Sequence, residues 1–133
     1  MTPRAASAVL ALTACQPADE PLDGRWDVQQ IAGASLGEGV YIWMAFDSAT
    51  QTVRGFTGCN EFTAPLSIFS ETVSIGPVSE SAGECASTAA ATDEQRFLLV
   101  LPLIQRRILR GQSLELLQTA SGSETLIRFR REA

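Results

Sequence analysis

The chain has 133 residues, of which 45% are hydrophobic, 7% aromatic and 19% charged, with a formal net charge of −5. This length suits a single domain, and this balance excludes a disordered chain. All ten basic residues are arginines and there is no histidine, which excludes a Ser-His-Asp triad, a histidine-ligated metal site, a Schiff-base lysine and a P-loop lysine. The negative charge also disfavours nucleic acid as a partner, because its phosphates would be repelled.

The chain opens with the pattern of an export signal. Arg4 is followed by an apolar run from Ala5 to Ala14 and then by Cys15, with small residues before the cysteine. The run is about half of the ~20 residues that a membrane-spanning helix needs. Leu12-Thr13-Ala14-Cys15 resembles the lipobox of bacterial lipoproteins, in which the cysteine is acylated and becomes the first mature residue. An ordinary signal peptide with an incidental cysteine and a buried hydrophobic segment are the alternatives.

The lipobox resemblance divides the chain into a signal peptide (residues 1–14), a flexible tether (15–23) and a folded domain (24–131). Two prolines and three acids with little to bury indicate the tether. Acyl chains on Cys15 would hold the protein at a membrane, since each buried methylene contributes about 0.8 kcal/mol. Gln16 rather than aspartate follows the cysteine, which favours the periplasmic face of an outer membrane over the inner membrane.

The two other cysteines, Cys59 and Cys85, form an even pair once Cys15 is acylated. In an oxidising compartment this pair predicts a disulfide. Two buried free thiols or half of a metal site are the alternatives. A metal would need further ligands, which without histidine would have to be carboxylates, so we expect no metal and no cofactor.

The hydrophobic pattern after the tether predicts many short strands. The clearest spans residues 40–47, where apolar side chains on both faces favour a strand that is covered on both sides. Pro65 interrupts a strand expected over residues 62–69 and indicates an edge or a bulge, because proline cannot donate to a ladder. Further strands are expected at 24–31, 52–57, 72–75, 106–109, 114–118 and 125–130.

One helix is expected after a loop that covers residues 78–91. Thr92 is a good N-cap, Gln95 follows at the capping-box spacing, and Asp93 with Glu94 suits the positive start of a helix. Pro102 should end or kink this helix. Together these elements predict a mainly β (α+β) fold, a curled antiparallel sheet or partly open barrel with one α-helix packed on it.

These landmarks resemble the META domain (HslJ-like) family over residues 24–131. The specific element is Gly-x-x-Gly-Cys-Asn-x-Phe, formed here by Gly55, Gly58, Cys59, Asn60 and Phe62. The resemblance implies a small antiparallel β domain with one helix, commonly exported and often lipid-anchored. It implies no reaction, because the family brings no established catalytic activity. The chain departs from the family pattern at Ala64-Pro65-Leu66 and at Pro102.

Most candidate site residues have a structural explanation as well as a functional one. Asn60 and Gly58 are expected to shape a turn. Trp26 and Trp43 are expected in the core, with ligand contact as the alternative. Arg54 could clamp an anionic group, as could Arg25, and surface ion pairs with Asp27 or Glu61 are the simpler expectation.

Two charged clusters have simple interpretations. The neighbouring acids Asp93 and Glu94 suit a helix start, and they do not resemble two carboxylates that face one substrate. Arg106, Arg107 and Arg110 are expected to form a solvated strand face, with an acidic partner or lipid head groups as the alternative.

The sequence favours a non-enzymatic, lipid-anchored envelope domain that supports integrity or stress tolerance through contacts with an envelope protein. A lipocalin-like carrier with a small hydrophobic ligand inside the sheet is the alternative, motivated by the apolar strand at residues 40–46. Hydrolysis is not expected, because it would need two acids from distant segments to converge in a cleft.

Overall fold

The computed structural model describes residues 21–118 and 124–132. The predicted signal peptide, Cys15 and most of the predicted tether lie outside these residues. Within them, ten strands form one antiparallel sheet together with one α-helix, α1 (Thr88–Val100), and a 3₁₀ turn, η3 (Leu101–Leu103). The strands are β1 (Gly24–Ile31), β2 (Ala34–Ser35), β3 (Trp43–Asp47), β4 (Thr52–Phe56), β5 (Glu61–Phe69), β6 (Thr72–Ile75), β7 (Ser79–Glu80), β8 (Arg106–Arg110), β9 (Ser113–Leu117) and β10 (Thr125–Arg131).

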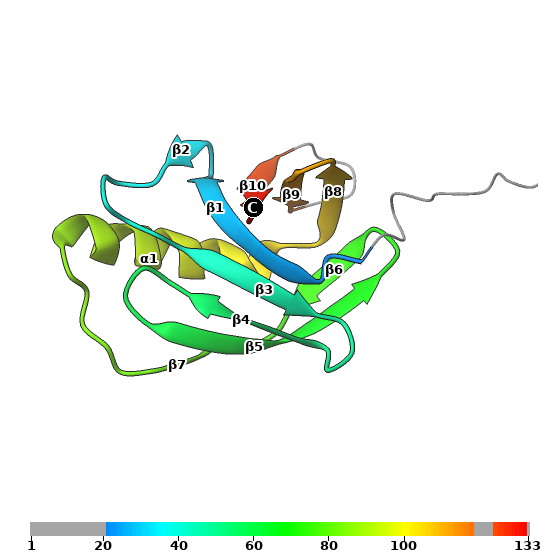
Figure 1. Cartoon of the computed structure of the whole chain (residues 1–133), viewed down its shortest axis with the longest axis horizontal. Helices are drawn as coiled ribbons and strands as arrows, with labels where there is room; N and C mark the ends of the chain where they lie inside the picture. Colours follow the sequence, from blue (N-terminus) through cyan, green and yellow to red (C-terminus); the bar gives the residue numbers. More distant parts are fainter. Residues whose placement is uncertain (1–20, 119–123, 133) are drawn as a thin grey trace, which may run out of the picture.

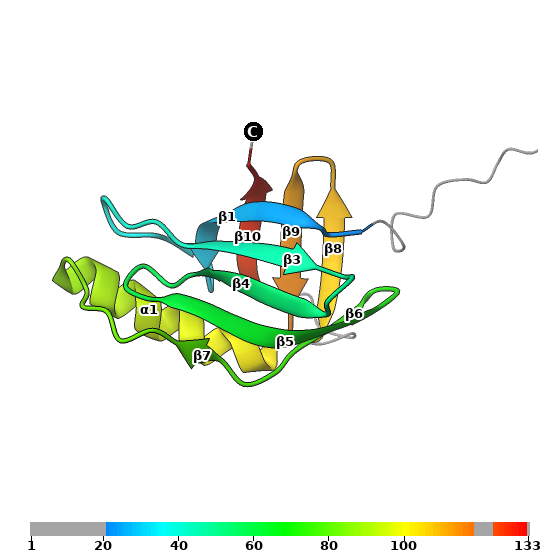
Figure 2. The same cartoon turned by 60° about the horizontal axis from the view of Figure 1, so that its bottom comes forward.

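The sheet curls into a ring. Its neighbours follow the order β10-β9-β8-β6-β5-β4-β3-β1-β2, and β10 also pairs with β1. The ring is weakest between β6 and β8, where the described pairing is Thr72 with Arg106. Figures 1 and 2 show the ring from two sides. This arrangement confirms the expected curled, partly open sheet with one helix.

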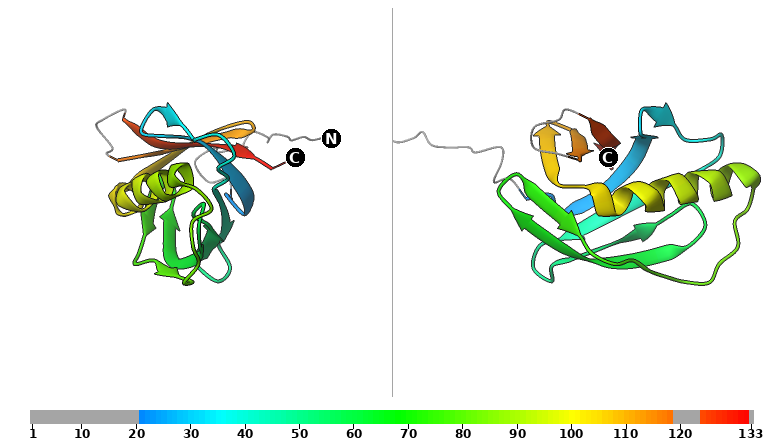
Figure 3. Two further views of the ribbon diagram at one scale, coloured as in Figure 1. Left: turned by 90° about the vertical axis from the view of Figure 1, so that its left-hand side faces the viewer. Right: turned by 180° about the vertical axis from the view of Figure 1, so that it is seen from behind.

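Helix α1 lies on the side of the ring that faces away from β3, as the view from behind shows (Figure 3). The Phe97 ring packs edge-on against the Phe62 ring, with centroids 5.6 Å apart. In the same helix, Asp93 accepts a hydrogen bond of 2.7 Å from the Gly37 backbone N–H, and Arg96 donates to the Ile31 carbonyl. No described helix combines the length and apolar character needed to cross a membrane.

The helix starts earlier than predicted. Its N-cap is Ser87, whose Oγ accepts a hydrogen bond from the Ala90 N–H at 3.0 Å, so Thr92 and Asp93 lie inside the helix. Alanine has the highest helix propensity, and the alanines at 89–91 extend the helix through a segment that was predicted to be a loop. Pro102 acts as predicted, because α1 ends at Val100 and the chain continues as η3.

The strand expected to be covered on both faces is covered on one. Val40, Ile42, Met44 and Phe46 are buried, whereas Tyr41 is 75% exposed. Nothing in the described chain covers the outer face of this segment completely, because α1 packs on the opposite side of the ring. The inward side chains join a single hydrophobic core with those of the other strands and of α1.

Pro65 lies inside a strand that is paired on both edges, so the prediction of an edge or a bulge was wrong. One edge of β5 pairs with β4 over residues 61–65. The other edge pairs with β7 at residues 62–63 and with β6 at residues 66–69. Pro65 falls between these two partners, where the Gly76 N–H donates to its carbonyl at 2.9 Å. Its missing N–H therefore faces a gap in the ladder, where no donor is required.

The folded domain begins before the predicted boundary at Gly24. Leu22 is completely buried, and its carbonyl accepts a hydrogen bond from Trp26 Nε1 at 2.9 Å. The Asp23 carboxylate accepts hydrogen bonds from Ser48. The predicted tether therefore cannot extend through Asp23.

Candidate functional site

The family motif forms a tight connection between β4 and β5. A Cβ atom on Gly55 would lie 2.9 Å from the Phe62 ring and would collide with the Trp43 carbonyl, so only glycine lets β4 approach β3 there. Gly58 has a φ of +102°, which other residues rarely adopt. The Thr57 N–H donates to the Asn60 carbonyl at 2.8 Å and closes the turn.

Asn60 is buried and lies at the centre of a hydrogen-bond network that reaches the surface at Glu80. Its Nδ2 donates to Glu94 at 2.8 Å and to Glu80 at 3.3 Å, and its Oδ1 accepts from the Gly83 N–H. Thr57, which is completely buried, donates its hydroxyl proton to Glu94 at 2.5 Å. The network joins the motif turn to β7 and α1, and it gives Asn60 the structural role expected of it. A satisfied buried network of this kind rigidifies the fold around it.

The Cys59–Cys85 disulfide links the same turn to the segment before α1, as predicted. Cys85 Sγ lies 3.8 Å from a carboxylate oxygen of Glu94. The two sulfurs and this oxygen lie within 4.8 Å of one another, a spacing that could hold a metal ion. Sulfur binds metal as a thiolate, so this group cannot act as a metal site while the disulfide is intact.

Glu80 and Glu94 form a hydrogen-bonded carboxyl pair with opposite pKa shifts. Burial raises the pKa of Glu80, and the hydrogen bond with Glu94 and its negative charge raise it further. Burial also acts to raise the pKa of Glu94, but hydrogen bonds from Thr57, Asn60 and Glu80 outweigh it and lower that pKa. Glu80 is therefore the member of the pair that takes up a proton first as pH falls.

Glu80→Gln is expected to stabilise the protein near neutral pH. A raised folded-state pKa means that the protonated form of Glu80 stabilises the fold at low pH, and that this contribution is lost as pH rises through the folded-state pKa. Glutamine can donate to Glu94 and accept from Asn60 at every pH. Because Glu80 is partly exposed, the expected gain in unfolding free energy is about 0.5 kcal/mol, measured by urea denaturation at neutral pH.

This gain should shrink as pH falls toward the range in which Glu80 is protonated. Glu84→Gln is the matched control, since it removes the same charge from an exposed residue nearby. Equal stability changes for the two variants at every pH would contradict the raised pKa of Glu80 and its hydrogen bond with Glu94 as the cause.

The carboxyl pair meets one condition for hydrolysis, because acids from distant segments converge here. Their geometry does not suit glycoside hydrolysis, because the two carboxyl groups form a hydrogen bond with each other. In glycoside hydrolases the two catalytic carboxyl groups are about 5 Å apart or more. Sequence reasoning missed the pair for two reasons. Glu80 belongs to no recognisable sequence motif. Glu94 was assigned to the first turn of the helix, but the helix begins further upstream, after Ser87.

A second cluster lies on the outer face of β1, β3 and β4, the strands in front of α1 in Figure 1. The Arg25 guanidinium lies 4.3 Å from the centroid of the Trp43 ring, and the Arg54 guanidinium lies 5.7 Å from it. We call these three residues the tryptophan face. Arg25 also pairs with Asp27 at 3.3 Å and with Glu132 at 3.6 Å. Arg54 has no carboxylate partner within the described residues and is exposed.

Trp43 separates two grooves on this face. One has a volume of about 390 Å³ and is lined by Arg54, Trp43 and Glu80, with hydroxyl groups from β5 and β7. The other has a volume of about 560 Å³ and includes Arg25 and Tyr41. The tryptophan face thus offers an aromatic ring, an unpaired cation and polar side chains between two hollows.

Comparison with known proteins decides the family. A family model described as the META domain matches residues 19–133. The chain belongs to the META domain family. Comparison of this META domain with curated proteins found no match.

Two solved structures resemble the META domain described here. One is the NMR structure of a protein from Burkholderia xenovorans, with 20% identity, 96% of each chain covered and a TM-score of 0.68. The other is an NMR structure with 11% identity that covers 88% of this chain and 96% of its own, with a TM-score of 0.64. At these identities the likeness shows the fold alone.

In the META domain structure, the residues predicted as possible ligand contacts lie in different environments. Trp26 is completely buried, with Arg131 4.1 Å from its ring centroid, and therefore belongs to the core. Trp43 and Arg54 instead meet at the surface. Arg107 is 4% exposed, so the expected solvated face of three arginines does not include it. Cys15 lies outside the described residues.

Proposed function

We propose that this META domain is a non-enzymatic, lipid-anchored module of the cell envelope that supports envelope integrity or stress tolerance through protein contacts. The tryptophan face is its contact surface, and the observation that carries the proposal is the exposed Arg54 guanidinium beside Trp43 without a carboxylate partner in the described chain. Tryptophan and arginine are the residues most enriched among those that dominate binding energy at interfaces.

The chemistry of this face suggests an acidic partner segment. A guanidinium loses hydration when it is buried, and a carboxylate with two oxygens replaces that hydration most completely. Arg25 is already paired with acids of this chain, so Arg54 is the cation available for a partner's carboxylate. The two neighbouring grooves can accommodate the side chains that flank the carboxylate in the partner segment.

Attachment of the module rests on Cys15. The lipobox resemblance supports acylation there, and a disulfide is compatible with an exported domain. The proposed location is the periplasmic face of the outer membrane, following the identity of Gln16.

The geometry supports a carrier function only in a modified form. Large side chains from several walls of the ring, including Trp26, Met44, Phe97 and Phe129, fill its interior. The two grooves beside Trp43 do reach the size of ligand pockets, which begins near 300 Å³. A small ligand would therefore lie on the outer face, and it would need polar groups to match the lining.

Photo-crosslinking in the native host tests the proposal. The chain has no lysine, so amine-reactive reagents are unsuitable, and a photoreactive amino acid is placed at Tyr41, which is 75% exposed and lines one groove. The wild-type background is compared with Cys15→Ser, Arg54→Glu and Arg110→Glu. Arg110 is 69% exposed and lies away from the tryptophan face on β8, so it provides the matched control.

The wild type should fractionate with membranes and form one major protein adduct. Cys15→Ser should leave the membrane fraction, while Arg54→Glu should stay in it and lose most of the adduct, and Arg110→Glu should behave as the wild type. Equal recovery of wild type and Cys15→Ser in membranes would refute the anchor. An adduct that Arg54→Glu and Arg110→Glu reduce equally would refute the contact surface.

A further inference from the structure

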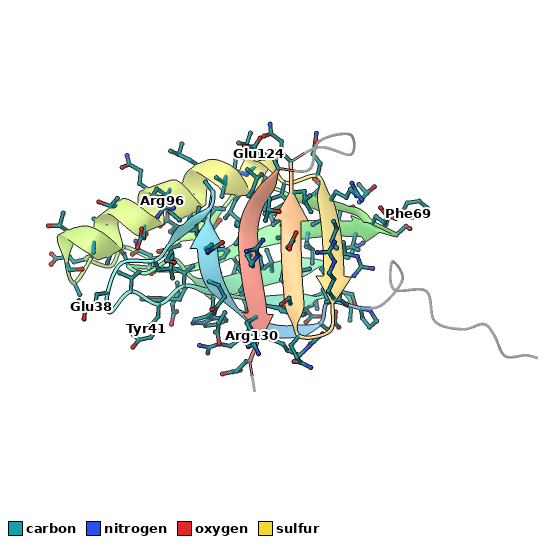
Figure 4. All side chains as sticks on the ribbon, turned by 90° about the horizontal axis from the view of Figure 1, so that it is seen from above. Glu38, Tyr41, Phe69, Arg96, Glu124 and Arg130 are labelled. Carbon is teal, nitrogen blue, oxygen red and sulfur yellow. A yellow bond between two sulfur atoms is a disulfide. The ribbon has the colours of Figure 1, made fainter. Side chains whose placement is uncertain are left out.

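Three exposed apolar side chains lie on the β5–β6 hairpin and on the segment that ends α1, two regions joined by the pairing of Thr72 with Arg106. The described chain has four large hydrophobic side chains that are strongly exposed, and three of them are Phe69 at 81%, Leu99 at 67% and Leu103 at 43%. Phe69 lies at the tip of the β5–β6 hairpin, while Leu99 and Leu103 lie at the end of α1 and in η3. The fourth, Tyr41, lies at the opposite end from Phe69 (Figure 4).

An apolar groove lies between these elements. It has a volume of about 460 Å³ and is lined by Leu98 and Pro102 on one side and by Ile75 to Val78 on the other, with the Glu80 carboxyl as its polar group. The chain from Phe97 to Ile104 carries no charge, and Glu71 near the hairpin tip is neutralised by Arg106 at 3.2 Å. We call Phe69, Leu99, Leu103 and this groove the apolar end.

The described chain begins at this end. Pro21 follows Cys15 by six residues, a stretch that spans at most about 22 Å, and the first described residues lie on the same side of the molecule as Phe69 (Figures 1 and 4). A bilayer that holds acyl chains on Cys15 is therefore always within reach. Such tethering turns contact with the bilayer into an intramolecular event, for which weak affinity suffices.

We propose that the apolar end is a membrane-contact surface, which places Phe69, Leu99 and Leu103 in the interfacial region of the bilayer. Aromatic and aliphatic side chains bury favourably at the boundary between head groups and acyl chains. The apolar end includes no basic side chain, so the contact does not depend on anionic lipid. The tryptophan face lies on other strands, β1, β3 and β4, and its Arg54 stays available to a partner. The proposal rests on the anchoring proposed at Cys15.

Vesicle flotation without the anchor tests the surface. The chain from Gln16 onward lacks both the apolar signal run and Cys15, and it keeps every core residue, since these begin at Leu22. It is mixed with neutral phosphatidylcholine vesicles at high lipid concentration. The parent should float in part, and Phe69→Ser/Leu99→Ser/Leu103→Ser should reduce the partition coefficient at least about tenfold.

Two further variants keep the outcome clear. Phe69→Ser alone changes a side chain that is 81% exposed, so its partial loss of flotation cannot come from unfolding, and Tyr41→Ser should float as the parent does. Failure of the parent to float, flotation only with anionic vesicles, or equal flotation of the triple variant would each overturn the proposal. Because Cys15 is absent throughout, these results are independent of whether the native chain is acylated.

Discussion

Reduction of the Cys59–Cys85 disulfide is expected to lower the unfolding free energy by roughly 3.5 kcal/mol, the chain-entropy value for residues 26 apart in sequence. For a domain of this size that corresponds to a fall in Tm on the order of 10–15 °C. The bond joins the motif turn to the segment before α1, so its loss frees the irregular segment between β7 and the helix. Thermal unfolding of the chain from Gln16 onward, with and without reductant, measures the effect.

A double variant, Cys59→Ala/Cys85→Ala, provides the control. Reductant should leave its Tm unchanged, and its stability should approach that of the reduced parent. If oxidised and reduced parent melt together, the disulfide does not stabilise this domain, and the hydrogen bonds of Asn60 hold the turn without it.

Gly55→Ala is expected to destabilise the domain by about 3 kcal/mol or more. Its backbone conformation is ordinary, so the cause is close approach rather than strain. The added Cβ would meet the Phe62 ring at 2.9 Å, the Met44 Cα at 3.1 Å and the Trp43 carbonyl. Two of these three contacts are with backbone, which cannot rotate away. The entropic gain from replacing glycine is only about 0.4–1 kcal/mol, so the collision dominates.

Gly111→Ala separates crowding from conformation. Gly111 has a φ of +59° and no atom near its hypothetical Cβ, so its substitution should cost only about 1 kcal/mol through backbone strain. Chemical denaturation of both variants measures the difference. If the two variants lose equal stability, close approach is not the reason for glycine at position 55.

The two proposed surfaces have different roles: the apolar end contacts the membrane, and the tryptophan face contacts a protein partner. The apolar end lies where the chain from Cys15 enters, and the tryptophan face lies on strands β1, β3 and β4. The Asn60 network and the disulfide hold β4, β5 and α1 together between them. The motif residues therefore stabilise the fold that presents both surfaces.

Much of this architecture was predictable because its signals are local. Alternating side chains predicted β10, where Ile127 and Phe129 are buried and Arg128 is exposed, and Pro102 predicted the end of the helix. Cysteine parity together with the expected export signal predicted the disulfide, because two thiols pair in an oxidising compartment. Hydrophobic periodicity, turn chemistry and covalent pairing need only neighbouring residues or residue counts.

Only the tertiary structure decided which residues meet across the ring. It brings Glu80 and Glu94 onto one amide nitrogen, buries Trp26 while leaving Trp43 partly exposed, and joins the β5–β6 hairpin to the segment after α1 through the pairing of Thr72 with Arg106. These contacts join side chains from elements far apart in the sequence, and no local pattern encodes the closure of the ring, for example the pairing of β10 with β1. Burial and pKa depend on that closure, because they are set by what surrounds a side chain in space.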